Sequence, residues 1–230
     1  MSGSVAVIAA HPDDEVLGCG GTIARMAHEG RAVHVLLMAD GETSRVSNSS
    51  NKVTADNLVA RNSAAKSACE ILGCASVQTL DLPDNRLDRL ELLDVVKEIE
   101  VFLHRYQPLT VLTHHSGDVN VDHQIVHRAV VTACRPQPDY FVKELFFFEV
   151  PSSTEWQPPG SSSPFIPNWF VDITTTLNQK LDALQAYASE LRPYPHPRSL
   201  EGVKALASWR GATVGVHAAE AFFLGRKLVV

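Results

Sequence analysis

Short apolar runs alternate with longer helical patterns through the first half of the chain. The runs that predict strands cover residues 5–10, 33–39, 77–82 and 109–115. The segments that predict helices cover residues 15–30, 54–73 and 89–106, and they stop at Gly30, at Gly73 and before Pro108. Strands with so little polar alternation are expected where helices cover both faces of a sheet, and glycine after the last turn is a usual helix stop. Repeated strand–helix units therefore predict an α/β fold with a mostly parallel central sheet.

The C-terminal half continues this plan less regularly. "KELFFFEV" (143–150) predicts another strand, and helical patterns resume at 174–191 and 199–211. Between them, "PSSTEWQPPGSSSPFIPNW" (151–169) is rich in Pro, Ser and Gly, and we expect an ordered surface loop or lid there because too little chain follows to build a second core. We expect residues 1–230 to form a single domain, a Rossmann-like three-layer sandwich of helices, sheet and helices.

The charge balance bears on partners and location. The 230 residues carry a formal net charge of −6, whereas nucleic acids and anionic membranes usually require a basic face, so neither is expected as a partner. No run of about 18 apolar residues and no basic leader is seen, so we expect no membrane span and a cytoplasmic location. None of the 4 cysteines forms a CxxC pair, as expected for reduced thiols. Apolar residues such as "LFFFEV" (145–150) could serve the core or a subunit contact, so a homo-oligomer stays open.

Groups that can bind a proton or a metal follow the first predicted strand in "AAHPDDEVLGCGG" (9–21). They are His11, Asp13, Asp14 and Glu15, and they lie where an open α/β sheet exposes its ligand site, outside the carboxyl end of a strand. The alternative is that these acids only cap the following helix and favour its dipole. One acid is enough for a cap, so the additional carboxylates and the histidine indicate chemistry.

A second polar cluster, "THHSGDVNVDHQIVH" (113–127), follows the fourth predicted strand. Its polar members are His114, His115, Asp118, Asn120, Asp122, His123 and His127. Because parallel strands end at one edge of a sheet, the two clusters can be neighbours although they are far apart in sequence. Ligands from each loop could then form a His/Asp/His metal site, and two imidazoles with one carboxylate favour zinc with a fourth position open for water.

Two other motifs fit the sequence less well. His123 and His127 have the spacing of the histidines in HExxH metalloproteases, but the second position is Gln124, which cannot act as a general base. "GCGG" (18–21) suggests a dinucleotide fingerprint, yet its glycines come too late after the strand and the third glycine is missing. Glycines within this helix are better explained by a close approach to the sheet.

Both clusters together resemble the PIG-L/LmbE-type deacetylases, which remove acetyl groups from N-acetylglucosamine-containing molecules. "AHPDDEVLGCGGT" (10–22) matches the first family motif without a gap, and "GDVNVDH" (117–123) is similar to the sugar-deacetylase form of the second. "GVHAAEAF" (215–222) is similar to a C-terminal family pattern. The resemblance therefore extends over nearly the whole chain.

The resemblance implies a role for each matching residue. His11, Asp14 and His123 would bind one Zn²⁺ per chain, or another divalent metal such as Fe²⁺, and Asp13 would be the general base. Several family members have a histidine that stabilises the oxyanion three residues before the last ligand, whereas this chain has Asn120 there. An amide can donate a hydrogen bond but cannot carry a positive charge. We expect Asp122 to hydrogen-bond a nearby histidine and support the site.

The expected activity is zinc-dependent removal of the acetyl group from an N-acetylated amino sugar, a small-molecule substrate. Polar residues that could bind the sugar hydroxyls are Glu42, Arg61, Asp84, His196 and Arg198, and the resemblance favours the first three. An exposed ion pair is the alternative for each charged residue among them. Two other classes stay open: a sugar- or metal-binding module without turnover, and a nucleotide-binding enzyme that would carry NAD or FAD in place of zinc.

Overall fold

The central feature of the computed structural model is a seven-stranded sheet with the order β3-β2-β1-β4-β5-β7-β6. The structure describes residues 3–43 and 55–229, so residue 54, where the second helix is predicted to begin, lies outside it. The strands are β1 (Val5–Ala9), β2 (Val33–Ala39), β3 (Ser76–Leu82), β4 (Thr110–His114), β5 (Glu144–Phe148), β6 (Trp169–Asp172) and β7 (Ala219–Lys227). β1 to β5 are parallel neighbours, as predicted from the repeated strand–helix units.

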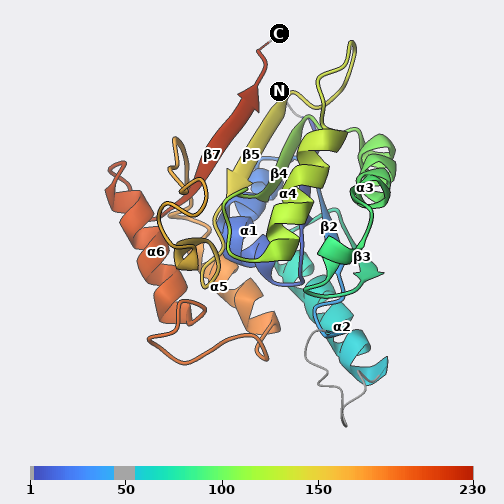
Figure 1. The fold of residues 1–230 in the computed structure, drawn as a ribbon. Helices are drawn as coiled ribbons and strands as arrows, with labels where there is room; N and C mark the ends of the chain where they lie inside the picture. The colour runs from blue at the N-terminus through green and yellow to red at the C-terminus, as the bar shows by residue number, and fades with distance from the viewer. Residues whose placement is uncertain (1–2, 44–54, 230) are drawn as a thin grey trace.

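Helices cover both faces of this sheet and complete the predicted three layers (Figure 1). They are α1 (Asp14–His28), α2 (Ala55–Leu72), α3 (Leu92–Tyr106), α4 (Val121–Ala133), α5 (Leu177–Ala186) and α6 (Leu200–Ala212). α3 and α4 pack on one face, and α1, α2 and α5 pack on the other. None of the helices in the described ranges has the length and apolarity needed to cross a lipid bilayer.

The two faces of β1 explain why its sequence lacks polar alternation. Val5, Val7 and Ala9 belong to the core beneath α1 and α2, whereas Ala6 and Ile8 belong to the core beneath α3 and α4. All five side chains are fully buried. A strand enclosed on both sides needs apolar residues at every position, which is the pattern that the sequence shows.

β6 and β7 are the part of the sheet that the sequence patterns did not predict. β7 runs antiparallel to β5, and β6 runs antiparallel to β7. β7 carries Glu220 in its buried half and alternates exposed and half-buried residues in its other half, so it lacks the apolar run that marks β1 and β2. β6 is short, half-buried and lies at the edge of the sheet. Neither strand therefore has a strong sequence signal.

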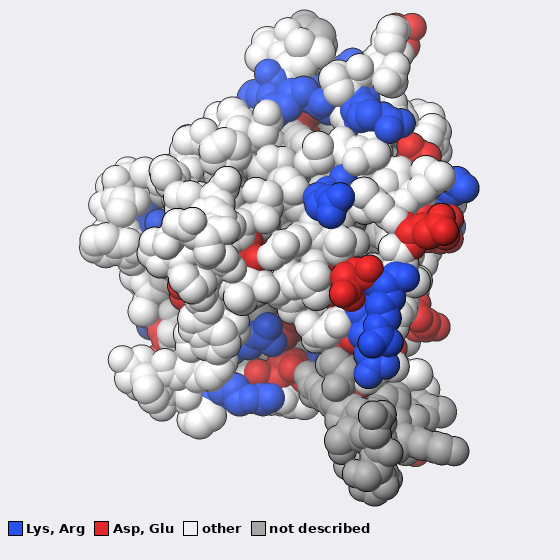
Figure 2. All heavy atoms as spheres, in the orientation of Figure 1, with Lys and Arg blue, Asp and Glu red and all other residues white. Residues whose placement is uncertain are grey.

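Lys and Arg side chains are scattered over the face shown in Figure 2, with Asp and Glu among them. The blue groups on this face are separated by neutral surface. This arrangement differs from the continuous basic patch that nucleic-acid-binding proteins usually present.

Candidate metal centre

His11 lies two residues after the end of β1, and its two ring nitrogens contact different carboxylates. Its Nε2 lies 3.1 Å from Asp122 Oδ2 and 3.1 Å from Asp84 Oδ1. Its Nδ1 lies 3.1 Å from Asp14 Oδ2, and the same carboxylate oxygen accepts the His11 backbone N–H at 2.9 Å. An Nε2–H that donates to Asp122 leaves the Nδ1 lone pair directed at Asp14, which is the arrangement of a metal-binding imidazole.

His123, in the first turn of α4, presents the opposite nitrogen to the same carboxylate. Its Nδ1 lies 3.1 Å from Asp118 Oδ2, and its Nε2 lies 3.1 Å from Asp14 Oδ2. Asp118 is itself held by Thr154 Oγ1 at 2.7 Å and by the Oγ of Ser153. With Nδ1–H donating to Asp118, the Nε2 lone pair faces Asp14. A carboxylate thus orients each imidazole from behind.

These contacts raise the pKa values of the two histidines, which favours positive charge at the centre. Burial alone would lower the pKa of His11, but hydrogen bonds to Asp122, Asp14 and Asp84 raise it well above its usual value. Burial opposes the same change at His123, where the charge of Asp14 and the hydrogen bond to Asp118 raise the pKa to about 9. The carboxylates therefore create a site that stabilises a cation.

The donor atoms fit a divalent metal. One ligand atom from each of His11, Asp14 and His123 lies within 4.8 Å of the others, and all three residues are buried. Among the described residues, Asp14 Oδ1 is buried without a hydrogen-bond partner, and His123 Nε2 is buried with its contact to Asp14 Oδ2 at 3.1 Å too poorly aligned to count as a hydrogen bond. Buried polar atoms are rarely left unpaired, and a bound cation would satisfy both. Two imidazoles and one carboxylate suit zinc.

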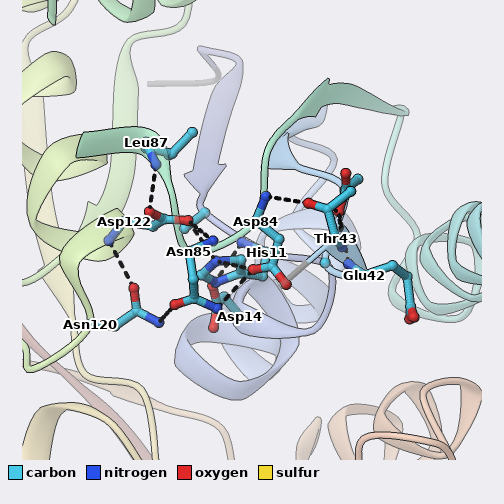
Figure 3. Close-up of polar contacts among 12 residues, drawn as sticks. His11, Asp14, Glu42, Thr43, Asp84, Asn85, Leu87, Asn120 and Asp122 are labelled. Carbon is cyan, nitrogen blue, oxygen red and sulfur yellow. Dashed lines mark hydrogen bonds and ion pairs between the residues drawn. The ribbon is translucent and has the colours of Figure 1, made fainter. Parts of the chain in front are cut away.

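A second group of donors, His11, Asp84 and Asp122, also meets within 4.8 Å. In this group, both oxygens of the Asp122 carboxylate already accept hydrogen bonds from backbone N–H groups. Oδ2 accepts that of Asn85 at 2.7 Å, and Oδ1 accepts that of Leu87 at 3.0 Å (Figure 3). Asp122 therefore serves better as the group that orients His11 than as a metal ligand.

Asp13 lies beside the centre in a strained conformation. Its φ is 120°, which non-glycine residues rarely adopt and which is typical of functional sites. Its side chain makes no hydrogen bond that caps α1, and its Oδ2 lies 3.1 Å from Arg198 Nη1. Burial raises the pKa of Asp13 to about 7, although the charge of Arg198 opposes the rise. Helix capping therefore does not explain Asp13, whereas a pKa near neutrality suits a general base.

Glu15, like Asp14, makes contacts beyond those of a helix cap. Glu15 accepts the Asp13 backbone N–H at 3.0 Å and the Tyr187 hydroxyl at 2.6 Å. Burial raises the pKa of Glu15 to about 8. Its contacts fix the strained backbone of Asp13 from the side of α1.

Asn120 is the N-cap of α4 and faces the cavity described below. Its Oδ1 accepts the Asp122 backbone N–H at 2.8 Å, which directs the amide nitrogen outward, and Nδ2 donates to Asn85 Oδ1 at 3.1 Å (Figure 3). An amide nitrogen has two hydrogens, so one is available for a ligand. The residue that replaces the family histidine therefore still offers a donor.

A polar cavity of about 100 Å³ opens in front of these residues. Its lining includes Arg61, Asp84, Asn85, Glu190 and Arg198. A hollow of about 450 Å³ lies near Leu109, Glu144 and Lys227, where β4 and β5 begin and β7 ends, so it faces the other edge of the sheet.

The predicted sugar-binding residues divide into those that line the cavity and those that do not. Arg61 lines it and is bound by Glu42 at 2.9 Å and by Glu190 at 2.5 Å. Arg198 and Asp84 line it as well. His196 is not among the lining residues: its Nδ1 accepts the Arg198 backbone N–H at 3.1 Å, and its ring packs edge-on against Trp156.

The sequence patterns missed several residues of the site. Glu190 is a single acid within a helical pattern, so nothing local distinguishes it from a surface residue. Asn85 contributes only through its backbone turn, at φ 53°, and its amide contact. His127 lies one turn beyond His123 on α4, where its Nδ1 contacts the His114 carbonyl at 2.9 Å.

A buried His/Asp donor set that could hold a metal lies at the carboxyl edge of a mostly parallel sheet, the edge at which α/β enzymes place their ligand sites. The chain belongs to the GlcNAc-PI de-N-acetylase (PIG-L) family, whose family model matches residues 6–134.

Individual relatives extend the similarity beyond the matched residues. The chain is 28% identical over 192 residues to the diacetylchitobiose deacetylase of Thermococcus kodakarensis, covering 81% of this chain and 69% of the relative. It is 30% identical over 204 residues to the 4-oxalmesaconate hydratase of Pseudomonas putida, covering 81% and 74%. The solved structure of the conserved protein TT1542 from Thermus thermophilus superposes with a TM-score of 0.77 at 29% identity, covering 99% and 97% of the two chains.

Proposed function

We propose that this protein is a metal-dependent hydrolase that removes the acetyl group from an N-acetylated amino sugar. The observation that carries the proposal is the pair of imidazoles, each oriented by a carboxylate, that direct opposite nitrogens at Asp14 beside the strained Asp13. The family match and the deacetylase among the relatives support it.

His11, Asp14 and His123 would hold the metal, with zinc as the ion that their chemistry favours and Fe²⁺ as the alternative. The bound ion would supply Lewis acidity, which polarises the amide carbonyl and lowers the pKa of a coordinated water. Asp122 and Asp118 orient the imidazoles of His11 and His123 from behind. They are positioning residues.

Asp13 moves the proton in this proposal. Arg198 holds Oδ2 at 3.1 Å, so Oδ1 accepts the proton of the attacking water. The same carboxyl group then gives this proton to the departing amine, and acetate and the free amino sugar are released. Asn120 Nδ2 donates to the oxygen that becomes negative, in the place where other family members offer a histidine.

The charges of the cavity favour a sugar over an anionic substrate. Arg61 and Arg198, the arginines that line it, are each in contact with carboxylates, namely Glu42 and Glu190 for the first and Asp13 for the second. A substrate carboxylate would also meet the carboxylates of Asp13, Asp84 and Glu190, which line the same cavity. The hydroxyl groups of a sugar can instead hydrogen-bond to Asp84, Glu190 and Asn85 without adding charge.

Hydration of an unsaturated carboxylate is the second candidate, because a relative that is 30% identical over 81% of this chain is named as a hydratase. It would use the same metal site but would release no acetate. The engaged arginines of the cavity argue against it.

Acetate release distinguishes the candidates. We expect the purified protein to release acetate from at least one member of a panel of N-acetylhexosamines and their glycosides, and we expect a chelator to abolish the release because the metal would be removed. Added zinc should restore it. A protein that is loaded with metal, releases no acetate and hydrates an unsaturated carboxylate, seen as a loss of ultraviolet absorbance, would contradict the deacetylase proposal. A metal-loaded protein without either activity would indicate a binding module.

We further propose that residues 1–230 act as one domain in the cytoplasm. The described strands all belong to one sheet, which supports a single domain. Cys19, Cys69, Cys74 and Cys134 all carry free thiols, as is usual in a reducing compartment.

A further inference from the structure

The first helix is broken just behind the metal centre. Within α1, Cys19 has φ −149° and ψ 22°, which are not helical values. The glycines around the break allow close packing: a Cβ on Gly18 would lie 2.3 Å from the ring of Phe148, and a Cβ on Gly21 would lie 2.8 Å from Ile173. The "GCGG" sequence therefore permits both the break and the close approach to the sheet.

The break exposes backbone groups that an unbroken helix would pair internally. The N–H groups of Gly21 and Thr22 donate to the two carboxylate oxygens of Glu220, at 2.9 and 2.7 Å. On the other side of the break, the carbonyl of Leu17 accepts a hydrogen bond from Lys180 Nζ at 2.8 Å. Glu220 thus caps the start of the second half of α1, and Lys180 caps the end of the first half.

Lys180 and Glu220 also bind each other. Their Nζ and Oε1 atoms are 2.6 Å apart, and the two residues are only 3% and 4% exposed. Thr176 Oγ1 adds a hydrogen bond to the Gly21 carbonyl at 2.8 Å. Buried ion pairs are costly unless each group has further partners, and here every further partner is a backbone group of the broken helix.

The consequence of this arrangement reaches the metal centre. The half of α1 before the break carries Asp14 in its first turn, and the two halves cannot become collinear while Lys180 and Glu220 occupy the break. We propose that Lys180 and Glu220 are positioning residues that set the direction of the first turn of α1 and therefore the place of Asp14. This inference rests on the proposed metal site. It also gives a physical role to the acid in "GVHAAEAF" (215–222), far along the chain from the first motif.

Metal affinity and stability together test the proposal. The variants are Lys180→Met, the neutral double variant Lys180→Met/Glu220→Gln, and Ile99→Ala in α3 as a control that opens a cavity in the core on the other face of the sheet. The readouts are the thermal midpoint and the dissociation constant for Zn²⁺, measured by competition with a chromophoric chelator at a temperature where circular dichroism shows each variant folded.

We expect Lys180→Met and Ile99→Ala both to lower the thermal midpoint, but only Lys180→Met to weaken zinc binding, by about tenfold or more, as is usual when support around a metal ligand is lost. The double variant should recover stability, because no unpaired charge remains, and should still bind zinc weakly. If Lys180→Met is too unstable to purify, the comparison of zinc affinity between the double variant and Ile99→Ala is sufficient for the test.

Zinc binding by the double variant within twofold of the wild type would overturn the positioning role, as would zinc affinity that simply follows stability across all variants. Failure of the proposed metal site looks different, because the wild-type protein itself would then bind no zinc, or would bind it equally well without His123. Failure of the proposed activity alone would leave the zinc affinities of all the variants unchanged and would appear only as a lack of acetate release.

Discussion

Replacing Asp13 with asparagine should leave zinc bound and lower kcat by about 10²–10⁴, the usual contribution of a general base. Asparagine has the same shape and tolerates a positive φ, so the strained backbone at 120° can persist. Its amide cannot accept the proton of the attacking water. The loss should therefore fall on kcat, measured by acetate release, whereas the zinc content of the purified variant should match that of the wild type.

Asp172→Asn provides the control for this experiment. Asp172 is an exposed residue at the end of β6 whose carboxylate contacts Thr174, away from the cavity. We expect this variant to keep wild-type turnover. Near wild-type activity of Asp13→Asn would contradict the assignment of Asp13 as the base.

Replacing His123 with alanine should remove both zinc and activity. The imidazole contributes the only ligand that α4 gives to the proposed metal site, and its loss leaves Asp14 and His11 alone. We expect the dissociation constant for zinc to rise by about 10²-fold or more and kcat/KM to fall by at least as much, because the fraction of loaded enzyme falls with the affinity.

His127→Ala is the matched control, because His127 lies on the same helix one turn later. Its ring packs against Phe147, and its Nδ1 contacts the carbonyl of His114. Zinc content and turnover should therefore be retained. Loss of zinc in both variants would favour the alternative histidine spacing, in which both histidines are ligands, and retention of zinc in His123→Ala would contradict the site.

The parallel part of the sheet could be predicted because its strands and helices are marked by signals within short stretches of sequence. β1, β2 and the last four residues of β5 are apolar at nearly every position, since both faces are covered, and the helices between the parallel strands stop shortly before Gly30, Gly73 and Pro108. β6 and β7 were missed because they are antiparallel, partly exposed, and paired with strands that are distant in sequence.

The site could be predicted in part for a similar reason. The two polar clusters follow strands that end at one edge, so their meeting is a consequence of parallel topology. Glu190 and Lys180 could not be found in this way, because each lies in a helical segment without a distinguishing pattern and acquires its role only through packing. The family pattern around Glu220 gave no indication of its partner. His196 shows the opposite case, since its neighbours in sequence suggested the cavity, whereas its ring packs against Trp156.

Anomalous diffraction at the zinc absorption edge, from crystals grown with zinc, tests the central claim most directly. We expect one strong peak per chain, about 2.0–2.3 Å from His11 Nδ1, a carboxylate oxygen of Asp14 and His123 Nε2. A peak held instead by Asp84 and Asp122, or one with His123 outside its coordination sphere, would contradict the metal centre described above.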